Sequence, residues 1–118
     1  MLTLICGLPN AGKTTNSQRF PNTIHSDDCK SMDEVLALVS ENDGDVCVEG
    51  MFFNRLSRKR LLGSYNGSGT KCILIDTPLD ICLEREDRGR LLPMIRNCAD
   101  MFEPPTYDEG WDEIEGIR

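Results

Sequence analysis

The chain has 118 residues, the size of one compact domain, and its 39% apolar and 28% charged residues are typical of a soluble globular protein rather than a disordered or fibrous one. No apolar run approaches the roughly 20 residues of a membrane-spanning helix, and MLTLIC lacks the basic flank of a secretory signal, so we expect a cytoplasmic protein without membrane contact. The net charge of −7, concentrated in the last residues, argues against binding nucleic acid over the whole surface but leaves room for a local phosphate-binding surface.

Short apolar runs alternate with helical patterns along the chain. In chain order, we predict a strand at 2–6, a helix at 13–20, a strand at 23–25, a helix from about 30 to the stop at 42–44, a strand at 45–49, a helix at 55–62, a strand at 72–75, a helix beginning at 78, a helix at 92–102 and a short edge strand ending the tail. Ser26 or Asp27 is expected to cap the second helix. This rhythm indicates βαβ units and a parallel sheet with helices on both faces.

The six cysteines form no CxxC pair, and several lie inside the apolar strand-like runs. Buried free thiols are therefore expected, rather than disulfides or a metal site.

Residues 7–14 read GLPNAGKT, which fits the pattern GxxxxGK[ST] between a predicted strand and a predicted helix. In such a P-loop, backbone N–H groups and the helix N-terminus point at phosphate oxygens. We expect Lys13 to reach the β- and γ-phosphates of ATP as a catalytic residue, and Thr14 to ligate Mg²⁺. The residues expected to bind the nucleotide are Gly7, Leu8, Pro9, Asn10, Ala11, Gly12, Lys13, Thr14 and Thr15.

With the P-loop motif, the predicted fold class is α/β: a three-layer P-loop NTPase fold with a four- to five-stranded, mainly parallel sheet between helices. One kinase-type domain spans 1–118, with a lid at about 85–92 and an acidic tail at 103–118.

Carboxylates follow two predicted strands. A kinase needs a carboxylate to accept the proton of the acceptor hydroxyl, and ligands of parallel sheets bind beyond the carboxyl ends of the strands. Asp27 is the candidate for this catalytic role, with helix capping as the alternative. Asp28 and Glu49 are candidates for binding the acceptor or magnesium, although Glu49 could also be a solvated strand end. His25, the single histidine, is interpreted as structural.

Arg85, Arg88 and Arg90 flank a glycine between two predicted helices. This arrangement is typical of a lid whose guanidinium groups close over the transferring phosphoryl group and exclude water. We interpret Arg85 and Arg88 as catalytic, with a solvated helix end as the alternative.

A second basic cluster lies at 55–60, on the helix after the third strand. Arg55 in this cluster could bind acceptor phosphates, or the cluster could be an exposed basic face. Lys30 is nearer the presumed acceptor and is also a substrate-binding candidate.

The motifs GLPNAGKTT, HSDDCK, VEGMFFNRLSRKRLL, IDTPLDICLERE, RGR and EPPTYDEGWDEI together resemble the kinase domain of the bacteriophage polynucleotide kinase type, within the small P-loop kinases that include zeta toxins. The resemblance implies that Asp27 is the general base, that Lys30 contacts a phosphate of the acceptor strand, and that Arg85 and Arg88 are lid arginines. The chain departs from the family at Glu49, where the family more usually has Asp.

We therefore expect an ATP- and Mg²⁺-dependent kinase. The resemblance implies that the acceptor is the 5′-hydroxyl end of DNA or RNA. Two alternatives stay open: a kinase of a small hydroxylated metabolite or nucleoside, and a nucleotide-binding regulatory or toxin-like module. No partner protein is evident from the sequence.

Overall fold

The computed structural model describes residues 1–86 and 92–117. Five strands form one parallel sheet in the order β2-β3-β1-β4-β5. The strands are β1 (Leu2–Gly7), β2 (Thr23–His25), β3 (Val46–Gly50), β4 (Thr70–Ile75) and β5 (Glu113–Ile117). The helices are α1 (Lys13–Ser17), α2 (Met32–Ser40), α3 (Arg55–Ser64), α4 (Leu79–Glu84) and α5 (Leu92–Met101), with 3₁₀ turns η1 (Ser26–Asp28) and η2 (Tyr107–Glu109).

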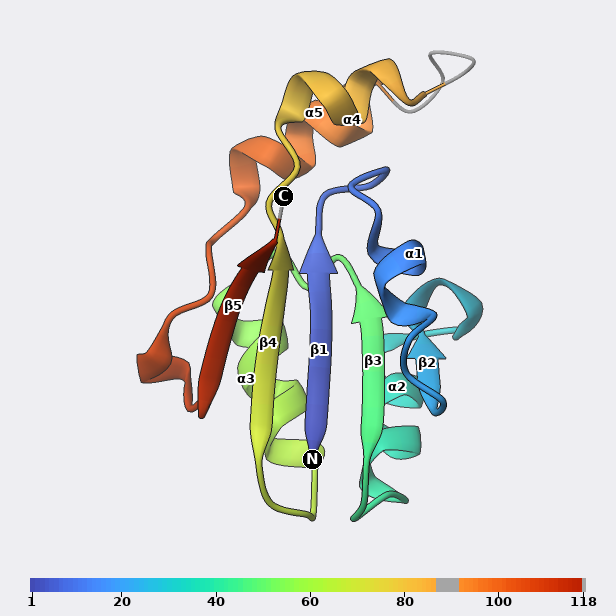
Figure 1. Ribbon diagram of the computed structural model, residues 1–118, viewed down its shortest axis with the longest axis vertical. Helices are drawn as coiled ribbons and strands as arrows, with labels where there is room; N and C mark the ends of the chain where they lie inside the picture. The colour runs from blue at the N-terminus through green and yellow to red at the C-terminus, as the bar shows by residue number, and fades with distance from the viewer. Residues whose placement is uncertain (87–91, 118) are drawn as a thin grey trace.

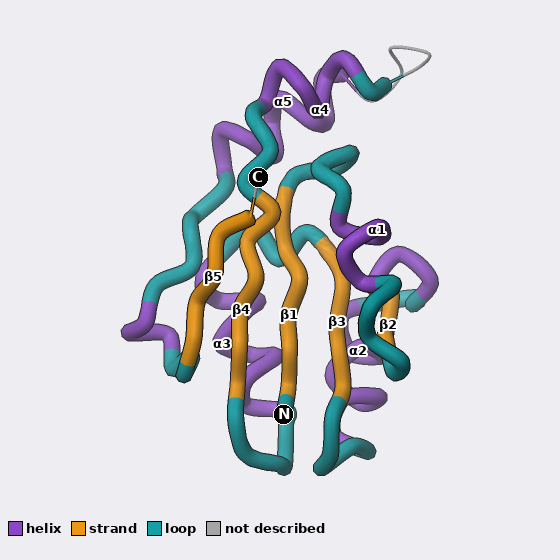
Figure 2. The backbone as a smooth tube through the Cα atoms, in the orientation of Figure 1, coloured by secondary structure: helices purple, strands orange, loops and turns teal. Residues whose placement is uncertain are grey.

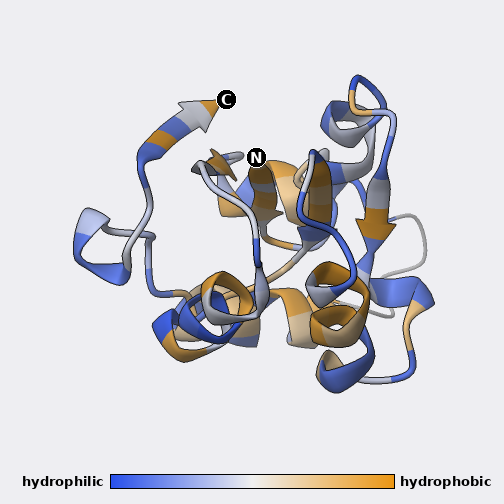
Figure 3. Cartoon of the chain, turned by 90° about the horizontal axis from the view of Figure 1, so that it is seen from below, coloured by the Kyte–Doolittle hydropathy of each residue, from blue (hydrophilic) through white to orange (hydrophobic). Residues whose placement is uncertain are grey.

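Helices cover both faces of the sheet. Helices α2 and α3 lie behind it in Figure 1, where their apolar residues pack with one side of β1 and with Trp111. On the opposite face α1 packs against β1 and β3, and a second apolar cluster joins Ile5 and Ile73 to Cys82 of α4 and Ile95 of α5. All six residues of β1 are consequently buried, as expected for a central parallel strand. Hydrophobic colour in Figure 3 is concentrated on the central strands and on the sides of the helices.

The predicted fold class is confirmed, including the edge strand in the tail. β5 pairs in parallel with β4, and Lys71 on β4 forms ion pairs with Glu115 and Glu113 of β5. The six cysteines are free thiols, and four of them are buried. Among residues 1–86 and 92–117, no helix is both long and apolar enough to cross a bilayer.

The predicted cap of the second helix is wrong. The Ser31 side chain accepts a hydrogen bond from the Glu34 backbone N–H at 3.3 Å, and Glu34 in turn accepts from the Lys30 backbone N–H at 2.7 Å. The helix thus begins at Met32, and Asp27 lies in the preceding turn η1. The first helix also ends early, at Ser17.

The basic cluster at 55–60 is exposed only in part: Lys59 is exposed, whereas Arg55 and Arg60 form ion pairs with Asp108 and Asp33. Arg58 is fully buried and donates two hydrogen bonds to Glu109, at 2.8 and 3.0 Å, and a third to the Phe52 carbonyl at 2.7 Å. Glu109 also accepts from the Trp111 indole N–H and the Thr106 backbone N–H. The tail is therefore fastened to the segment that follows β3.

The charge on Glu109 is maintained by these partners. Burial alone raises the pKa of this carboxyl, but hydrogen bonds from Arg58, Trp111 and Thr106 outweigh burial and lower its pKa overall. A carboxyl with a lowered pKa stabilises the folded state above its ordinary pKa of 4.5, and this contribution is lost as the pH falls through the lower folded-state value.

We predict that Glu109→Gln lowers the free energy of unfolding by about 3 kcal/mol, because it leaves the Arg58 guanidinium buried without a countercharge. Urea unfolding at neutral pH measures this loss. The matched control is Arg60→Gln, which removes the exposed ion pair with Asp33. This change should lower the free energy of unfolding by about 1 kcal/mol or less. Equal losses in the two variants would contradict the assigned role of the buried pair.

Candidate functional site

All five strands are parallel, so their carboxyl ends meet at one edge of the sheet, where Figure 2 shows the loops that leave β1, β3 and β4. The loop after β1 connects directly to α1 and carries the predicted P-loop sequence. The site is built around this loop.

The shape of the loop depends on its glycines. A Cβ atom on Gly7 would lie 2.8 Å from the Ile75 carbonyl oxygen of β4, so only glycine allows this approach of the two strands. Gly12 has a φ of 105° and Asn10 a φ of 65°, both in the left-handed region. These conformations turn the backbone into α1, whose first N–H groups have no partner within the helix.

Two neighbouring segments hold the loop in place. The Thr77 hydroxyl donates to the Ala11 carbonyl at 2.7 Å, and the Arg85 guanidinium donates to the Asn10 carbonyl at 2.8 Å. The loop is thus attached both to the end of β4 and to the end of α4. Sequence reasoning missed Thr77, although its place two residues after the predicted strand at 72–75 was a usable signal.

Lys13 folds back over the loop. Its ammonium group donates to the carbonyls of Gly7 and Leu8, at 2.9 and 3.0 Å. Burial lowers the pKa of Lys13 from its ordinary value, while the charges of Glu49 and then Asp27 raise it in opposition. A desolvated ammonium held only by neutral carbonyls will interact strongly with an anion that replaces them.

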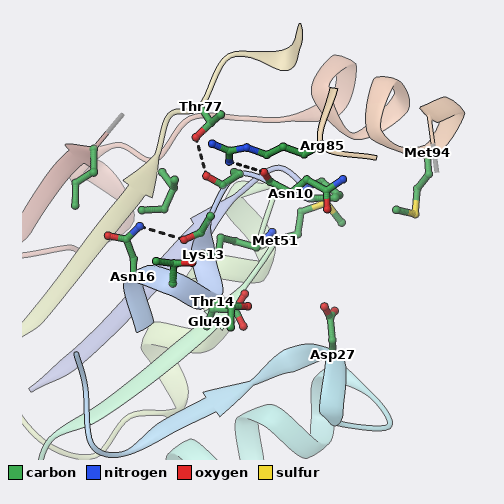
Figure 4. Close-up of a pocket in the computed structure, with 16 residues that line it drawn as sticks. Asn10, Lys13, Thr14, Asn16, Asp27, Glu49, Met51, Thr77, Arg85 and Met94 are labelled. Atoms are coloured by element: carbon green, nitrogen blue, oxygen red, sulfur yellow. Dashed lines mark hydrogen bonds between the residues drawn. The ribbon is translucent and has the colours of Figure 1, made fainter. Parts of the chain in front are cut away.

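The loop opens on a cleft of about 870 Å³. Figure 4 shows the side chains around it, with Lys13, Thr14 and Glu49 near the centre, Asp27 at the lower right and Met94 at the upper right. The described lining consists of 9–16, Asp27, Glu49, Met51, Ile75, Thr77, Arg85, Met94 and Ile117. The sequence held no signal that would place Met51, Met94 and Ile117 in the lining of the cleft.

The two carboxylates of the cleft have different environments. Asp27 is exposed, and within the described ranges its side chain makes no hydrogen bond and caps no helix, which removes the alternative interpretation of this residue. Glu49 is only 5% exposed, so it is not a solvated strand end. One Glu49 oxygen lies 2.8 Å from His25 Nδ1.

Other predicted residues lie elsewhere. Asp28 and Lys30 are exposed and are not among the described residues that line the cleft. Arg55 pairs with Asp108 at 2.7 Å, also outside this lining. The carbonyls of Gly7 and Leu8 accept from Lys13, but neither residue is among the described lining, and Arg88 lies outside the described residues.

Comparison with known proteins identifies the fold. No family model and no curated protein matches the chain. A gluconokinase from Sinorhizobium meliloti 1021 has a similar structure, with a TM-score of 0.68, 14% sequence identity, and coverage of 97% of this chain and 79% of that one. The structure of APE1195 is similar with a TM-score of 0.63 and 16% identity, covering 98% of this chain and 83% of that one. The chain thus has a P-loop kinase-like α/β fold, with five parallel strands between helices.

Proposed function

We propose that the protein is an ATP-dependent kinase that transfers the γ-phosphate of ATP to a hydroxyl acceptor. One observation carries this proposal: Lys13 of the P-loop shares a single cleft with two carboxylates, Asp27 and Glu49. A general base must be free to contact the acceptor, and among residues 1–86 and 92–117 the Asp27 side chain makes no hydrogen bond.

The loop and Lys13 bind the triphosphate. Phosphate oxygens replace the carbonyls of Gly7 and Leu8 as acceptors for the Lys13 ammonium, and the free N–H groups at the start of α1 bind further oxygens. Arg85 already donates to the loop at Asn10 and has other N–H donors for the transferring phosphoryl group.

The residues present fit a magnesium ion that arrives with the nucleotide. Within the described part of the chain, no group of three or more His, Cys, Asp and Glu side chains could hold a metal ion. The Thr14 hydroxyl and the Glu49 carboxylate line the same cleft, and Mg²⁺ typically takes one or two such protein ligands together with phosphates and waters. When bound, Mg²⁺ would neutralise charge on the β- and γ-phosphates.

Asp27 serves as the general base. It accepts the proton of the acceptor hydroxyl as the acceptor oxygen bonds to the γ-phosphorus and the bond from this phosphorus to the β–γ bridging oxygen breaks. ADP and the phosphorylated acceptor leave. This role stands on the position of Asp27 in the cleft and on the resemblance described above.

The acceptor has two candidates. The sequence resemblance supports the 5′-hydroxyl end of DNA or RNA. The basic residues favour a small hydroxylated compound, because few of them are free to bind the phosphates of a nucleic acid. Arg55 and Arg58 are paired with carboxylates of the tail, and Lys30 lies outside the described lining. A nucleic acid would need free cations beside the cleft for its phosphates. The fold shared with a gluconokinase also supports a small acceptor.

Lys13→Ala is expected to reduce phosphate transfer by at least about 100-fold, because the mutation removes the ammonium that binds the triphosphate. ATP consumption with the accepted substrate measures the loss. Lys59→Ala, a change at an exposed lysine outside the described lining, is the matched control and should retain activity. Full activity of the Lys13 variant would exclude this site as the phosphate-binding site.

Asp27→Asn should retain ATP affinity within about threefold while transfer falls by about 10²–10⁴, the range typical of a lost general base. Equilibrium ATP binding and single-turnover transfer separate the two effects. Asp28→Asn, one residue away and outside the described lining, should lose far less. A fully active Asp27→Asn variant would overturn the assignment of the base.

A radiolabel screen with [γ-³²P]ATP tests the acceptor. We expect product with small hydroxylated compounds and little with 5′-hydroxyl oligonucleotides. Efficient labelling of oligonucleotides would reverse this choice in favour of the polynucleotide acceptor. Tight ATP binding without any labelled product would instead indicate a regulatory module.

A further inference from the structure

His25 is in direct contact with the candidate site, although its sequence context indicated only a structural role. Strands β2 and β3 pair in parallel, and their register places His25 directly opposite Glu49. The imidazole Nδ1 lies 2.8 Å from Glu49 Oε2. The His25 side chain is 36% exposed and that of Glu49 is 7% exposed, so a half-buried imidazole bonds to a buried carboxylate that lines the cleft.

The chemistry of the two groups fixes the direction of this hydrogen bond. An ionised carboxylate can only accept, so Nδ1 must carry the proton and donate it to Glu49. This hydrogen bond uses Oε2 of Glu49, and His25 does not bond to Oε1. A buried carboxylate needs such a partner, because an unpaired buried charge is costly.

Glu49 is close to the phosphate-binding end of the cleft. Its charge raises the pKa of Lys13 more strongly than that of Asp27 does. In Figure 4 Glu49 is drawn at the P-loop residue Thr14, and Asp27 is drawn apart from both on another element of the cleft lining.

We propose that His25 is a positioning residue. Its Nδ1–H fixes one oxygen of Glu49 so that the other oxygen is oriented toward the magnesium ion bound with ATP. A glutamate side chain has several rotatable bonds, and a hydrogen bond to one oxygen selects a single orientation before the nucleotide arrives. This inference rests on the proposed function, since it assigns Glu49 to the metal rather than to the acceptor.

The test compares substitutions that differ in one hydrogen bond. In His25→Asn, the amide nitrogen of the new side chain can occupy the place of Nδ1 and donate to Glu49, whereas His25→Leu has similar bulk and no donor. We expect His25→Leu to weaken Mn²⁺ binding to the protein–ATP complex by about 10–100-fold, the range typical of lost partners of metal ligands. His25→Asn should stay within about threefold of the wild type.

Mn²⁺ titration followed by electron paramagnetic resonance measures this binding without turnover. The Mg²⁺ dependence of transfer gives a second readout, in which His25→Leu raises the Mg²⁺ concentration for half-maximal rate more than it lowers the maximal rate. ATP affinity without metal should be equal in both variants. Thr23→Val, which removes hydrogen bonds to Ser17 and Phe20 from the same strand, controls for a general weakening of β2.

The outcomes separate this inference from the proposed function. Equal Mn²⁺ affinities in the wild type and both variants would overturn the positioning role, as would equal losses in the Leu and Asn variants. If His25→Leu does not fold, His25→Gln replaces it, because its amide extends beyond the Nδ1 position and should fail to rescue binding. If the wild type binds Mn²⁺ and ATP but transfers no phosphate, the kinase proposal fails while the role of His25 in metal binding stands.

Discussion

The parallel pairing of β1 with β3 on one side and β4 on the other is the constraint on which the candidate site depends. Strand β1 is buried along its whole length, and its last residue, Gly7, lies too close to the Ile75 carbonyl to tolerate a side chain. The loop that follows is held at the end of β4, where the Thr77 hydroxyl donates to the Ala11 carbonyl. In the same sheet β3 and then β2 lie next to β1. Glu49 on β3 and Asp27 after β2 therefore line the same cleft as the loop.

Features with a local signal could be predicted from the sequence. Apolar runs defined the strands, and two glycines, a lysine and a threonine at fixed spacing defined the loop. The start of α2 could not be placed, because Ser26, Asp27 and Ser31 are all good capping residues. Tertiary packing holds Ser26 away from the start of α2. Its side chain lies against Gly50 of β3, so closely that a Cβ atom on Gly50 would collide with the Ser26 hydroxyl.

Pairs that form across the chain left no local signal. The cluster at 55–60 looked like a basic surface, yet Arg58 lies three residues before the buried Leu61 and shares its inward side of α3. That spacing was a usable signal for burial, but its countercharge, Glu109, could not be identified without the tail in place. The contact of His25 with Glu49 likewise depends on which strands are neighbours, a property of topology rather than of either residue.

The Arg58–Glu109 pair also affects when the chain can fold during its synthesis. The two residues are 51 positions apart, so the guanidinium leaves the ribosome well before the glutamate that balances its charge. Until the ribosome releases that segment, α3 would have to bury a guanidinium without its countercharge, which opposes docking of this helix on the sheet. Since β5 must also wait for residues 113–117, the central strands and the P-loop can assemble early, and the packing of α3 and β5 is completed only after these later residues have emerged.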